Sequence, residues 1–304
     1  MTTSENTTDA APQPPHYLDG HAFARPNKTA LACGERSLTY AELNARARRV
    51  ANTLRGLGVQ ANDRVVVMAY NSIELLEIVG GLSKLSAISV LTNYRLRPGE
   101  LAYIANDCQA SALLVGPGLV GIAEQARSEL QKQIPCIAIG NEVPAGWLRY
   151  EELLASASED LIAGEGGLGS TMSYTSGTTG KPKGAYRPKS VPANDIIQIV
   201  QAFELTEPDV HLLAGPYYHS APSFFVSLHS LLGSTIVIQP KFDAEEALSL
   251  IERYKVTTTF MPPVLLQRLC DIPEEVFARY DISSLRTIIL GGAPCPYALK
   301  VRAS

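Results

Sequence analysis

The chain has 304 residues, 46% of them apolar, and its 26 basic and 30 acidic side chains give a formal charge of −4. This length suggests two domain-sized units, and the apolar content is enough for a large core, which excludes a disordered or collagen-like chain. The mildly acidic charge argues against a general nucleic-acid binder, whose surface would be basic. Apolar runs such as residues 75–82 are far shorter than the roughly 20 residues that cross a bilayer, so we expect no membrane span.

Residues 1–15 are rich in Thr, Ser, Asn, Gln and Pro and lack both a basic start and an apolar stretch. They are expected to form a disordered tail rather than a secretory signal. The cysteines are scattered, odd in number and without a close pair: Cys33, Cys108, Cys136, Cys270 and Cys295. They fit neither a disulfide framework nor a zinc site, so a reducing cytoplasm is the simplest compartment for them.

A helix is predicted to begin after Thr39 and to stop near Gly58. Thr39 and Glu42 have the spacing of a capping box, in which the Thr39 hydroxyl accepts a hydrogen bond from the Glu42 amide. Four basic side chains decorate this helix: Arg46, Arg48, Arg49 and Arg55. We interpret them as a solvated face rather than as a phosphate or lipid contact.

Apolar and β-branched runs predict strands, and helical periodicity predicts the helices between them. The predicted strands lie near residues 65–69, 87–91, 112–115, 136–139, 171–175, 211–214, 235–238, 256–260 and 287–290. The predicted helices lie near residues 72–84, 98–106, 120–131, 195–203, 223–231, 244–254 and 263–270, and residues 140–169 look like a connection between two halves. Strands that alternate with helices in this way predict an α/β fold with a largely parallel sheet.

One segment differs from the rest of the chain in composition. Residues 174–184 read Tyr-Thr-Ser-Gly-Thr-Thr-Gly-Lys-Pro-Lys-Gly, after a predicted strand, and no acidic residue occurs from Gly166 to Asn194. Glycines let the backbone approach a ligand, successive amides form an anion-binding nest, and hydroxyls and lysines add donors and charge. The segment is therefore predicted to bind a polyphosphate rather than to serve as a flexible linker.

This segment is not a Walker A loop. That motif needs a glycine five positions before Gly180 and a hydroxyl residue after Lys181, where this chain has Thr175 and Pro182. A phosphate loop that caps a helix is therefore not expected.

Residues 174–184 resemble the signature phosphate loop of the adenylate-forming superfamily, which includes acyl-CoA synthetases, firefly-type luciferases and peptide-synthetase adenylation domains. Residues 216–221 (Pro-Tyr-Tyr-His-Ser-Ala) are similar to the family's segment that lines the acyl pocket, and residues 291–294 (Gly-Gly-Ala-Pro) to the turn beside adenine and the acyl group. Residues 38–43 are similar to its usual amino-terminal helix start. The resemblance implies two Rossmann-like, largely parallel sheet subdomains of the family's large domain, at about residues 16–165 and 166–304.

The resemblance also assigns roles to single residues. Lys183 and His219 would be catalytic: Lys183 would neutralise charge on departing pyrophosphate, and His219 would lie at the mouth of the acyl channel, walled by Tyr218 and Phe224. Thr175 would also contact Mg2+. The phosphates of ATP would be held by Thr175, Ser176, Gly177, Thr178, Thr179, Gly180 and Lys183, and the adenosine and acyl groups would be flanked by Gly291, Gly292, Ala293 and Pro294.

These residue types suit the activation of a carboxylic acid. A carboxylate attacks the α-phosphorus of ATP, pyrophosphate leaves, and acyl-AMP forms, which requires positioning and charge stabilisation more than proton transfer. Magnesium would bridge the phosphates, and the thiol of coenzyme A would then attack the acyl-AMP carbonyl. The resemblance thus implies a cytoplasmic, AMP-forming acyl-CoA synthetase for a fatty or aromatic acid, as in fatty acid metabolism, with no nucleic-acid partner; a homo-oligomer is left open.

Two other interpretations stay open. One is an adenylation domain or acyl-AMP ligase that loads a carrier protein, although the uncharged residues after His219 favour an acyl tail over an amino acid. The other is an inactive nucleotide-binding fragment, because the sequence ends at Ser304. In the resembled family the magnesium-linked glutamate, the ribose-binding aspartate and a small carboxy-terminal domain with an essential lysine come later, so the large domain is expected to be incomplete here.

Several side chains also have structural explanations. His219 is consistent with a structural histidine, and Tyr217, Tyr218, Phe224 and Phe225 are consistent with core residues. No Gly-x-Ser-x-Gly elbow is present, which argues against a serine hydrolase. Cys295 has no evident partner base and is expected to be a small buried residue rather than a nucleophile.

Overall fold

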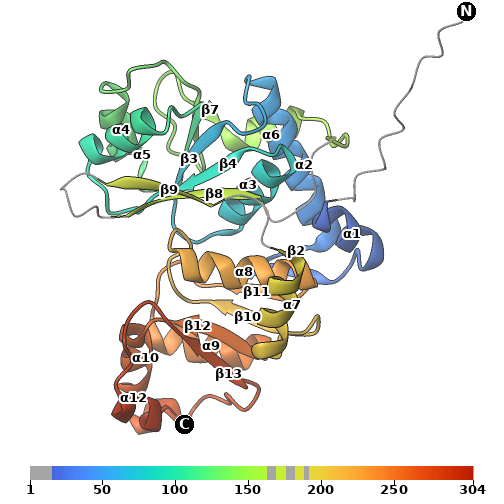
Figure 1. Ribbon diagram of the computed structural model, residues 1–304, viewed down its shortest axis with the longest axis vertical. Coiled ribbons are helices and arrows are strands. Elements are labelled where there is room, and N and C mark those ends of the chain that lie inside the picture. The colour runs from blue at the N-terminus through green and yellow to red at the C-terminus, as the bar shows by residue number, and fades with distance from the viewer. Residues whose placement is uncertain (1–15, 163–168, 176–181, 188–191, 304) are drawn as a thin grey trace, which may run out of the picture.

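The computed structural model of the chain describes residues 16–162, 169–175, 182–187 and 192–303. The predicted disordered tail at residues 1–15 lies outside this part. Two β-sheets lie one above the other along the long axis of the molecule, with helices between and around them (Figure 1). Each sheet is parallel apart from one antiparallel edge strand, β2 or β9. The predicted α/β fold with largely parallel sheets is confirmed.

The seven-stranded sheet has the order β7-β6-β5-β3-β4-β8-β9. Its strands are β3 (Arg64–Met68), β4 (Ile88–Leu91), β5 (Ala112–Val115), β6 (Cys136–Ala138), β7 (Leu148–Arg149), β8 (Ser170–Thr175) and β9 (Lys183–Arg187). The helices that accompany it are α3 (Ile73–Lys84), α4 (Pro98–Asp107), α5 (Val120–Arg127) and α6 (Tyr150–Ser156).

The six-stranded sheet has the order β13-β12-β10-β11-β1-β2. Its strands are β1 (Thr29–Cys33), β2 (Arg36–Thr39), β10 (Val210–Leu213), β11 (Thr235–Ile238), β12 (Thr258–Met261) and β13 (Thr287–Leu290). The remaining helices are α1 (Tyr17–Ala24), α2 (Tyr40–Gly56), α7 (Ala193–Ala202), α8 (Ser220–Leu232), α9 (Ala244–Tyr254), α10 (Pro263–Cys270), α11 (Glu274–Phe277) and α12 (Tyr297–Arg302).

Every strand and helix that the sequence predicted is present, most of them within two or three residues of the predicted bounds. The structure adds elements that the sequence analysis did not predict: α1, β1, β2, β7, α6, β9, α11 and α12. The segment 140–169, predicted to be only a connection, contains β7 and α6, which extend and cover one edge of the seven-stranded sheet. Most of these additions are short or lie at sheet edges, where hydrophobic periodicity has little length in which to appear. The strand β1 and the helix α1 are exceptions, because they are as long as elements that the sequence did predict.

The two sheets exchange strands across residue 165, where we predicted the boundary between subdomains. The early strands β1 and β2 belong to the six-stranded sheet, and the later strands β8 and β9 complete the seven-stranded sheet. One buried apolar cluster also draws on both sheets, with Val65 and Ile73 on one side and Leu213, Ile236 and Ile238 on the other. Residue 165 therefore does not separate the two sheets or their core. The division into two subdomains at this residue stays a prediction about folding units.

The helix α2 begins as the sequence predicts. The Thr39 hydroxyl accepts from the Glu42 amide at 3.3 Å, and the Glu42 carboxylate accepts from the Thr39 amide at 2.7 Å, which is a complete capping box.

The interpretation of the α2 arginines as a solvated face is wrong for Arg46, Arg48 and Arg49 and agrees with the structure for Arg55, which is exposed. Arg46 bonds to the fully buried Glu77 at 2.5 Å and to Glu151 at 2.7 Å, and the Arg46 side chain is only 22% exposed. The other three also have partners: Arg48 with Asp19, Arg49 with Glu159 and Arg55 with Asn52. The helix lies among acidic side chains of α1, α3 and α6, so Arg46 and Arg48 bind neighbouring elements, whereas Arg55 bonds only within α2.

In the part of the chain that the structure describes, no helix is both long and apolar enough to cross a membrane.

Candidate active site

The carboxyl ends of parallel strands from both sheets meet in one region. Asn71, shortly after β3, donates hydrogen bonds to the carbonyl oxygens of Gly215 and Gln239, which follow β10 and β11. The ring of Tyr94, after β4, lies 5.5 Å from the ring of Tyr218, after β10. Ligands of open parallel sheets bind at the carboxyl ends of the strands. The place where the two carboxyl edges face each other is therefore the first place to look for a site.

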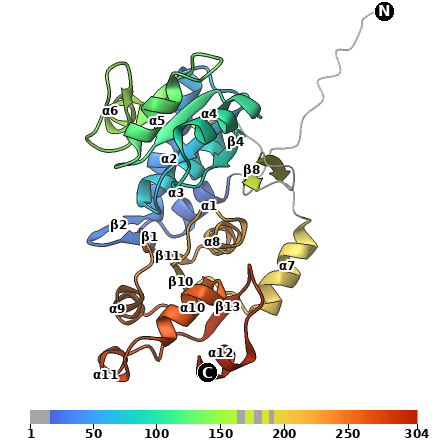
Figure 2. The ribbon, with the colours of Figure 1, turned by 90° about the vertical axis from the view of Figure 1, so that its left-hand side faces the viewer.

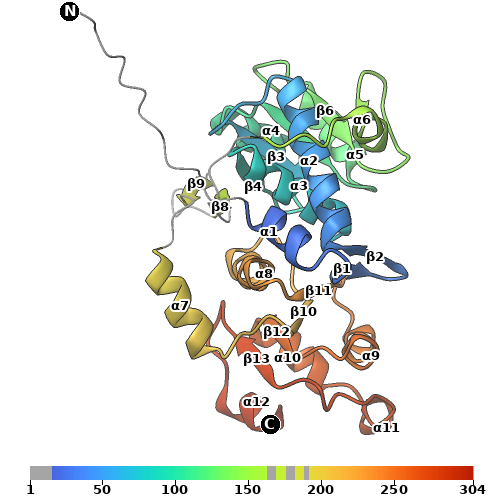
Figure 3. The ribbon, with the colours of Figure 1, turned by 90° about the vertical axis from the view of Figure 1, so that its right-hand side faces the viewer.

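The predicted phosphate loop connects β8 and β9, a hairpin at the edge of the seven-stranded sheet. Thr175 is paired with Lys183 at the last position of the ladder. Between these two stems, the predicted ligands Ser176, Gly177, Thr178, Thr179 and Gly180 lie outside the described residues. Lys183 is described and its side chain is exposed. Figures 2 and 3 show this hairpin and α7 on the same side of the molecule.

The helix α4 contacts the stems of this hairpin on both sides of the loop. The Tyr174 hydroxyl donates to the Asp107 carboxylate at 2.5 Å, and the Tyr103 hydroxyl donates to the Pro182 carbonyl oxygen at 3.2 Å. Burial, together with the hydrogen bond to Asp107, raises the pKa of Tyr174 far above its usual value, so the hydroxyl stays protonated and remains a donor. Two residues one helical turn apart on α4 thus fix the start and the end of the loop.

His219 stands at the start of α8, in a short turn that follows β10. The ring lies 4.4 Å from that of Tyr218, and the sequence of neighbouring rings continues through Tyr94 to Tyr70, 4.5 Å further on. Partial burial lowers the pKa of His219, so its imidazole is held neutral near pH 7. The aromatic ladder, defined as Tyr70, Tyr94, Tyr218 and His219, joins the two sheets at their carboxyl edges.

The four aromatic residues around His219 divide into two kinds. Tyr217 and Phe225 are buried, as the core interpretation expects, and burial raises the pKa of Tyr217 to about 12. Tyr218 and Phe224 are only half-buried. The family resemblance implies that these last two residues are walls of an acyl channel. Their side chains are partly exposed, so they could line such a channel.

The turn at Gly291, Gly292, Ala293 and Pro294 follows β13 at the same edge of the six-stranded sheet. Gly292 has φ of +83°, which favours glycine, and a Cβ on Gly291 would lie 3.0 Å from the Phe260 ring. The backbone conformation therefore favours glycine at position 292, and close packing against Phe260 favours it at position 291. Cys295, expected to be buried, is half-buried in the structure, because the turn around it lies at the surface.

A cavity of about 480 Å3 opens between the two carboxyl edges. Among the described residues that line it, Arg95, Lys241 and Arg268 are basic and none is acidic. The Lys241 ammonium lies 4.2 Å from the centre of the Tyr70 ring, and the Arg268 guanidinium 5.0 Å from that of Phe242. A cation that packs on an aromatic ring is not neutralised by a carboxylate, so it can still bind an anion. The cavity therefore suits a phosphate-bearing ligand. We call it the basic cavity.

The sequence analysis missed the residues of the basic cavity. A usable signal existed, because Tyr70 and Asn71, Tyr94 and Arg95, and Pro240 and Lys241 each stand within a few residues of a predicted strand's carboxyl end. These residues form no local motif, because they are far apart in the sequence and meet only when the two sheets are in place.

A larger cavity of about 870 Å3 lies against α9, α10, α11, α12 and β13. Its lining is mostly aliphatic, and none of the predicted site residues is part of it. Size alone therefore does not mark the site, and we assign the chemistry to the carboxyl edges.

The described residues contain no group of three His, Cys, Asp or Glu side chains that could hold a metal ion. The metal contact predicted for the Thr175 hydroxyl stays a prediction. Magnesium fits the chemistry as the companion of a nucleotide's phosphates, which supply hard oxygen ligands of their own.

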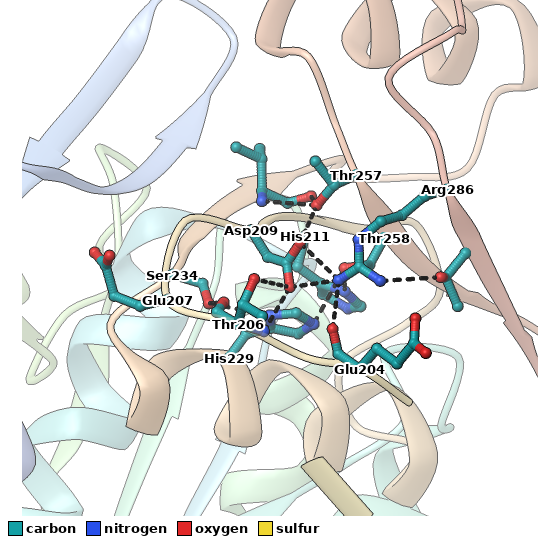
Figure 4. A network of polar contacts seen from close by, with 12 residues as sticks. Glu204, Thr206, Glu207, Asp209, His211, His229, Ser234, Thr257, Thr258 and Arg286 are labelled. Carbon is teal, nitrogen blue, oxygen red and sulfur yellow. Dashed lines mark hydrogen bonds and ion pairs between the residues drawn. The ribbon is translucent and has the colours of Figure 1, made fainter. Parts of the chain in front are cut away.

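At the opposite, amino edge of the six-stranded sheet, polar side chains bind one another (Figure 4). Thr258 Oγ1 lies 3.0 Å from His211 Nδ1 and 3.1 Å from His229 Nε2, and the two imidazole rings stack at 4.3 Å. Asp209 binds Arg286 through both carboxylate oxygens, at 2.9 and 2.8 Å. The polar groups of this cluster are engaged in hydrogen bonds with one another.

Burial sets the charge states in this amino-edge cluster. It lowers the pKa of His229 to about 4 and that of His211 well below its usual value, so both rings are neutral. Burial alone would raise the pKa of Asp209, but the hydrogen bonds from Thr257 and Arg286 hold it below the usual value. The cluster therefore contains one ion pair and two uncharged histidines.

Comparison with known proteins decides the family. A family model described as "AMP-binding enzyme" matches residues 18–304. The chain belongs to this family. Adenylate-forming CoA ligases, the branch of the AMP-binding enzymes in which its relatives fall, use ATP and coenzyme A as substrates.

Two curated relatives are CoA ligases. The indoleacetate–CoA ligase of Aromatoleum aromaticum is 33% identical over 288 residues, which cover 93% of this chain and 56% of that protein. The long-chain-fatty-acid–CoA ligase of Thermus thermophilus is 32% identical over 267 residues, 87% of this chain and 49% of that protein. The chain thus spans about half the length of these relatives.

The fold agrees with a solved structure of the same family. The anthranilate CoA ligase AuaEII in complex with anthranoyl-AMP superposes with a TM-score of 0.83 and 27% sequence identity, covering 94% of this chain and 56% of that one. The chain is therefore an amino-terminal portion of the AMP-binding enzyme fold, as the resemblance of the phosphate loop implied.

Proposed function

We propose that the complete protein activates a carboxylic acid with ATP to form acyl-AMP and pyrophosphate, and then transfers the acyl group to coenzyme A. The observation that carries this proposal is the position of the β8–β9 hairpin. Its paired stems, Thr175 and Lys183, place the ends of the Gly-, Thr- and Lys-rich segment at the carboxyl edge, in a family of AMP-binding enzymes. The anthranoyl-AMP bound by the similar anthranilate ligase supports the same intermediate here.

In the first step a carboxylate oxygen of the acid bonds to the α-phosphorus of ATP, and the bond from that phosphorus to the oxygen bridging to the β-phosphorus breaks. The electron pair of that bond leaves with pyrophosphate. Lys183 stands at the base of the loop with an exposed ammonium, where it would stabilise this departing charge. Loop amides and hydroxyls would hold the phosphates in line, and magnesium would arrive bound to ATP.

In the second step the sulfur of coenzyme A attacks the acyl-AMP carbonyl, the thiol proton is lost, and AMP leaves. The basic cavity supports coenzyme A rather than a carrier protein as the acceptor. Coenzyme A carries several phosphates, and a cavity lined by Arg95, Lys241 and Arg268 without an acidic neighbour among the described lining residues suits such a ligand. A carrier protein would present a single phosphodiester and need an extended protein surface instead.

The acid is proposed to have an uncharged tail. The residues near the predicted acyl side are aromatic or small, with Tyr218 and Phe224 half-buried and Ser220 to Ser223 uncharged. An amino-acid substrate would require a carboxylate for its ammonium, and no acidic side chain stands beside His219 in the sequence. The relatives act, by name, on indoleacetate and on long-chain fatty acids, so both aromatic and aliphatic tails fit this proposal.

The test is pyrophosphate release by the complete protein with ATP and indoleacetate, ferulate or palmitate, followed by thioester formation on addition of coenzyme A. Acid-dependent release with at least one of them is expected. Absence of release with every acid overturns the proposal. Release without thioester formation, but with acyl transfer to a phosphopantetheinylated carrier protein, would instead make the protein a carrier-loading ligase. The same assay on residues 1–304 alone shows whether this portion can catalyse the first step.

A further inference from the structure

Asn71 is a buried residue whose side chain crosses from one sheet to the other. It stands between β3 and α3, and it is 4% exposed. Its Nδ2 donates to the Gly215 carbonyl oxygen at 2.9 Å and to the Gln239 carbonyl oxygen at 3.0 Å. Its Oδ1 accepts from the Tyr217 amide at 2.8 Å. A single amide side chain of the seven-stranded sheet thus satisfies three backbone groups at the carboxyl edge of the six-stranded sheet.

Two of those three bonds hold the turn that carries His219. Gly215 and Tyr217 flank Pro216, and the Pro216 carbonyl oxygen accepts from the His219 amide at 3.1 Å. The His219 carbonyl oxygen in turn accepts from the Ser223 amide at 3.2 Å, in the first turn of α8. The backbone from Gly215 to α8 is therefore fixed at its start by Asn71 and at its end by the helix, with His219 between.

The chemistry of this contact selects asparagine. Two backbone carbonyls and one backbone amide require a side chain with two donor hydrogens and one acceptor in a fixed plane, which the amide group supplies. An aspartate would direct an acceptor at two carbonyl oxygens, and an alanine would leave three buried backbone groups without partners. Thus neither change keeps the turn where it is.

The aromatic ladder gives this turn a second contact with the seven-stranded sheet. Tyr218 packs against Tyr94, which follows β4, at 5.5 Å. The side chains on the turn therefore meet the other sheet by ring contacts, while Asn71 holds the backbone. Loss of Asn71 is expected to shift the turn relative to β4 and β8 rather than to unfold either sheet.

We propose that Asn71 is a positioning residue for the acid: it sets the place of the turn from Pro216 to His219, and through it the wall of the acyl channel. The inference rests on the proposed function and adds a residue that acts on the acid through the turn, because its amide group is engaged by backbone groups of Gly215, Tyr217 and Gln239 although the side chain also lines the basic cavity. Because α4 holds the hairpin of the phosphate loop separately, we expect a change at Asn71 to affect the acid more than ATP.

The experiment compares Asn71→Ala and Asn71→Ser with a matched variant at the opposite edge, Thr258→Val, which removes the hydroxyl shared by His211 and His229. In the complete protein, steady-state pyrophosphate release is measured with the one of indoleacetate, ferulate and palmitate that the wild type uses best. Asn71→Ala is expected to raise KM for the acid about tenfold, with KM for ATP changed less than about twofold, because misplacement of a substrate wall acts on that substrate. Thr258→Val should lower the melting temperature, and it should not raise KM for the acid selectively over KM for ATP.

Asn71→Ser retains a small polar group and should fold even if Asn71→Ala does not. It is expected to show the same selective rise in KM for the acid. Equal changes in the two KM values, or no change in either Asn71 variant, overturn the inference while leaving the proposed function intact. A wild type with no acid-dependent release overturns the proposed function and the inference with it.

Discussion

The two edges of the six-stranded sheet use their polar residues in opposite ways. At the amino edge, the side chains of Asp209, His211, His229, Thr258 and Arg286 form hydrogen bonds within one cluster that joins β10, β12 and α8 to the loops beside them (Figure 4). Charge is present only as an ion pair, and the histidines are buried and uncharged. This edge stabilises the sheet.

At the carboxyl edge, the described basic side chains line a cavity in which they could bind a ligand. Arg95, Lys241 and Arg268 lie over aromatic rings rather than beside carboxylates. The turns there contain Gly291 and Gly292, where a side chain would clash or strain the backbone. Asn71 makes three hydrogen bonds there, all of them to backbone groups. Within the described residues, the polar groups at the amino ends of these strands therefore serve stability, while the carboxyl ends are where we propose that a ligand binds.

The largest expected effect of a single change is at the carboxyl edge. Lys183→Ala should lower kcat/KM for pyrophosphate release by roughly 10²- to 10³-fold, because one charge that stabilises the leaving group is lost. Lys183 is exposed, so the melting temperature should hardly change. Steady-state kinetics and differential scanning calorimetry of the complete protein provide the two measurements. A parallel loss of activity and of melting temperature would show that the lysine is structural and that the division between the edges is wrong.

The opposite pattern is expected at the amino edge. Asp209→Ala removes a carboxylate that binds Thr206, Thr257 and Arg286, and should lower the free energy of unfolding by about 3 kcal/mol. KM for ATP and for the acid should stay unchanged at a temperature where the variant is folded. Urea unfolding checks the first value and steady-state kinetics the second.

Asp281→Ala is the control for Asp209→Ala. Asp281 pairs with Lys255 at 2.9 Å on the surface, and exposed pairs stabilise little. A loss of stability as large as that of Asp209→Ala would mean that burial does not distinguish the two ion pairs.

The buried histidines of the amino edge predict a dependence of stability on pH. Unfolding returns His229 from a pKa of about 4 to about 6.5, so below pH 6.5 the unfolded chain binds a proton that the folded chain does not. The free energy of unfolding should therefore fall as the pH drops from about 6.5 to about 4, by up to roughly 1.4 kcal/mol per pH unit for each such group. His211 adds in the same direction.

Urea unfolding at several pH values measures this slope. His229→Gln should reduce the slope in that pH range, whatever it does to stability at pH 8. His219→Asn, at the carboxyl edge, should change the slope less, because His219 is much less buried than His229. Equal changes in slope for the two variants would show that the two edges do not differ in how they bury their histidines.

The sequence predicted the α/β class and nearly every central strand because apolar runs such as β5 and β11 carry their own signal. It could not predict which sheet each strand joins, because β1 pairs with β11 and β8 pairs with β4, and these partners are far apart in the sequence. The candidate phosphate loop could be predicted from the sequence because its residues are consecutive, and its role stays a prediction. Asn71 and Lys241 were missed because their role depends on two sheets meeting, and no local pattern records that. The α2 arginines were misjudged for the same reason: their partners, such as Glu77 and Glu151, lie on other helices.

The smallest effect that we predict concerns the attachment of the hairpin to α4. Tyr103→Phe removes the hydroxyl that donates to the Pro182 carbonyl oxygen at 3.2 Å, next to Lys183. One such hydrogen bond is worth about 1 kcal/mol, so KM for ATP should rise about three- to fivefold, with KM for the acid unchanged. This is the reverse of the selectivity expected for the Asn71 variants, since the two residues hold the two sides of the site.

Tyr254→Phe is the matched control, because the Tyr254 hydroxyl also donates to a backbone carbonyl, that of Gly34 at 3.0 Å, but on the surface near the start of β2. It should leave both KM values unchanged. If Tyr103→Phe raised KM for the acid instead of KM for ATP, the loop between Thr175 and Lys183 would be serving the acid side. The nucleotide would then have to be held elsewhere along the carboxyl edge, with the basic cavity as the next position to test.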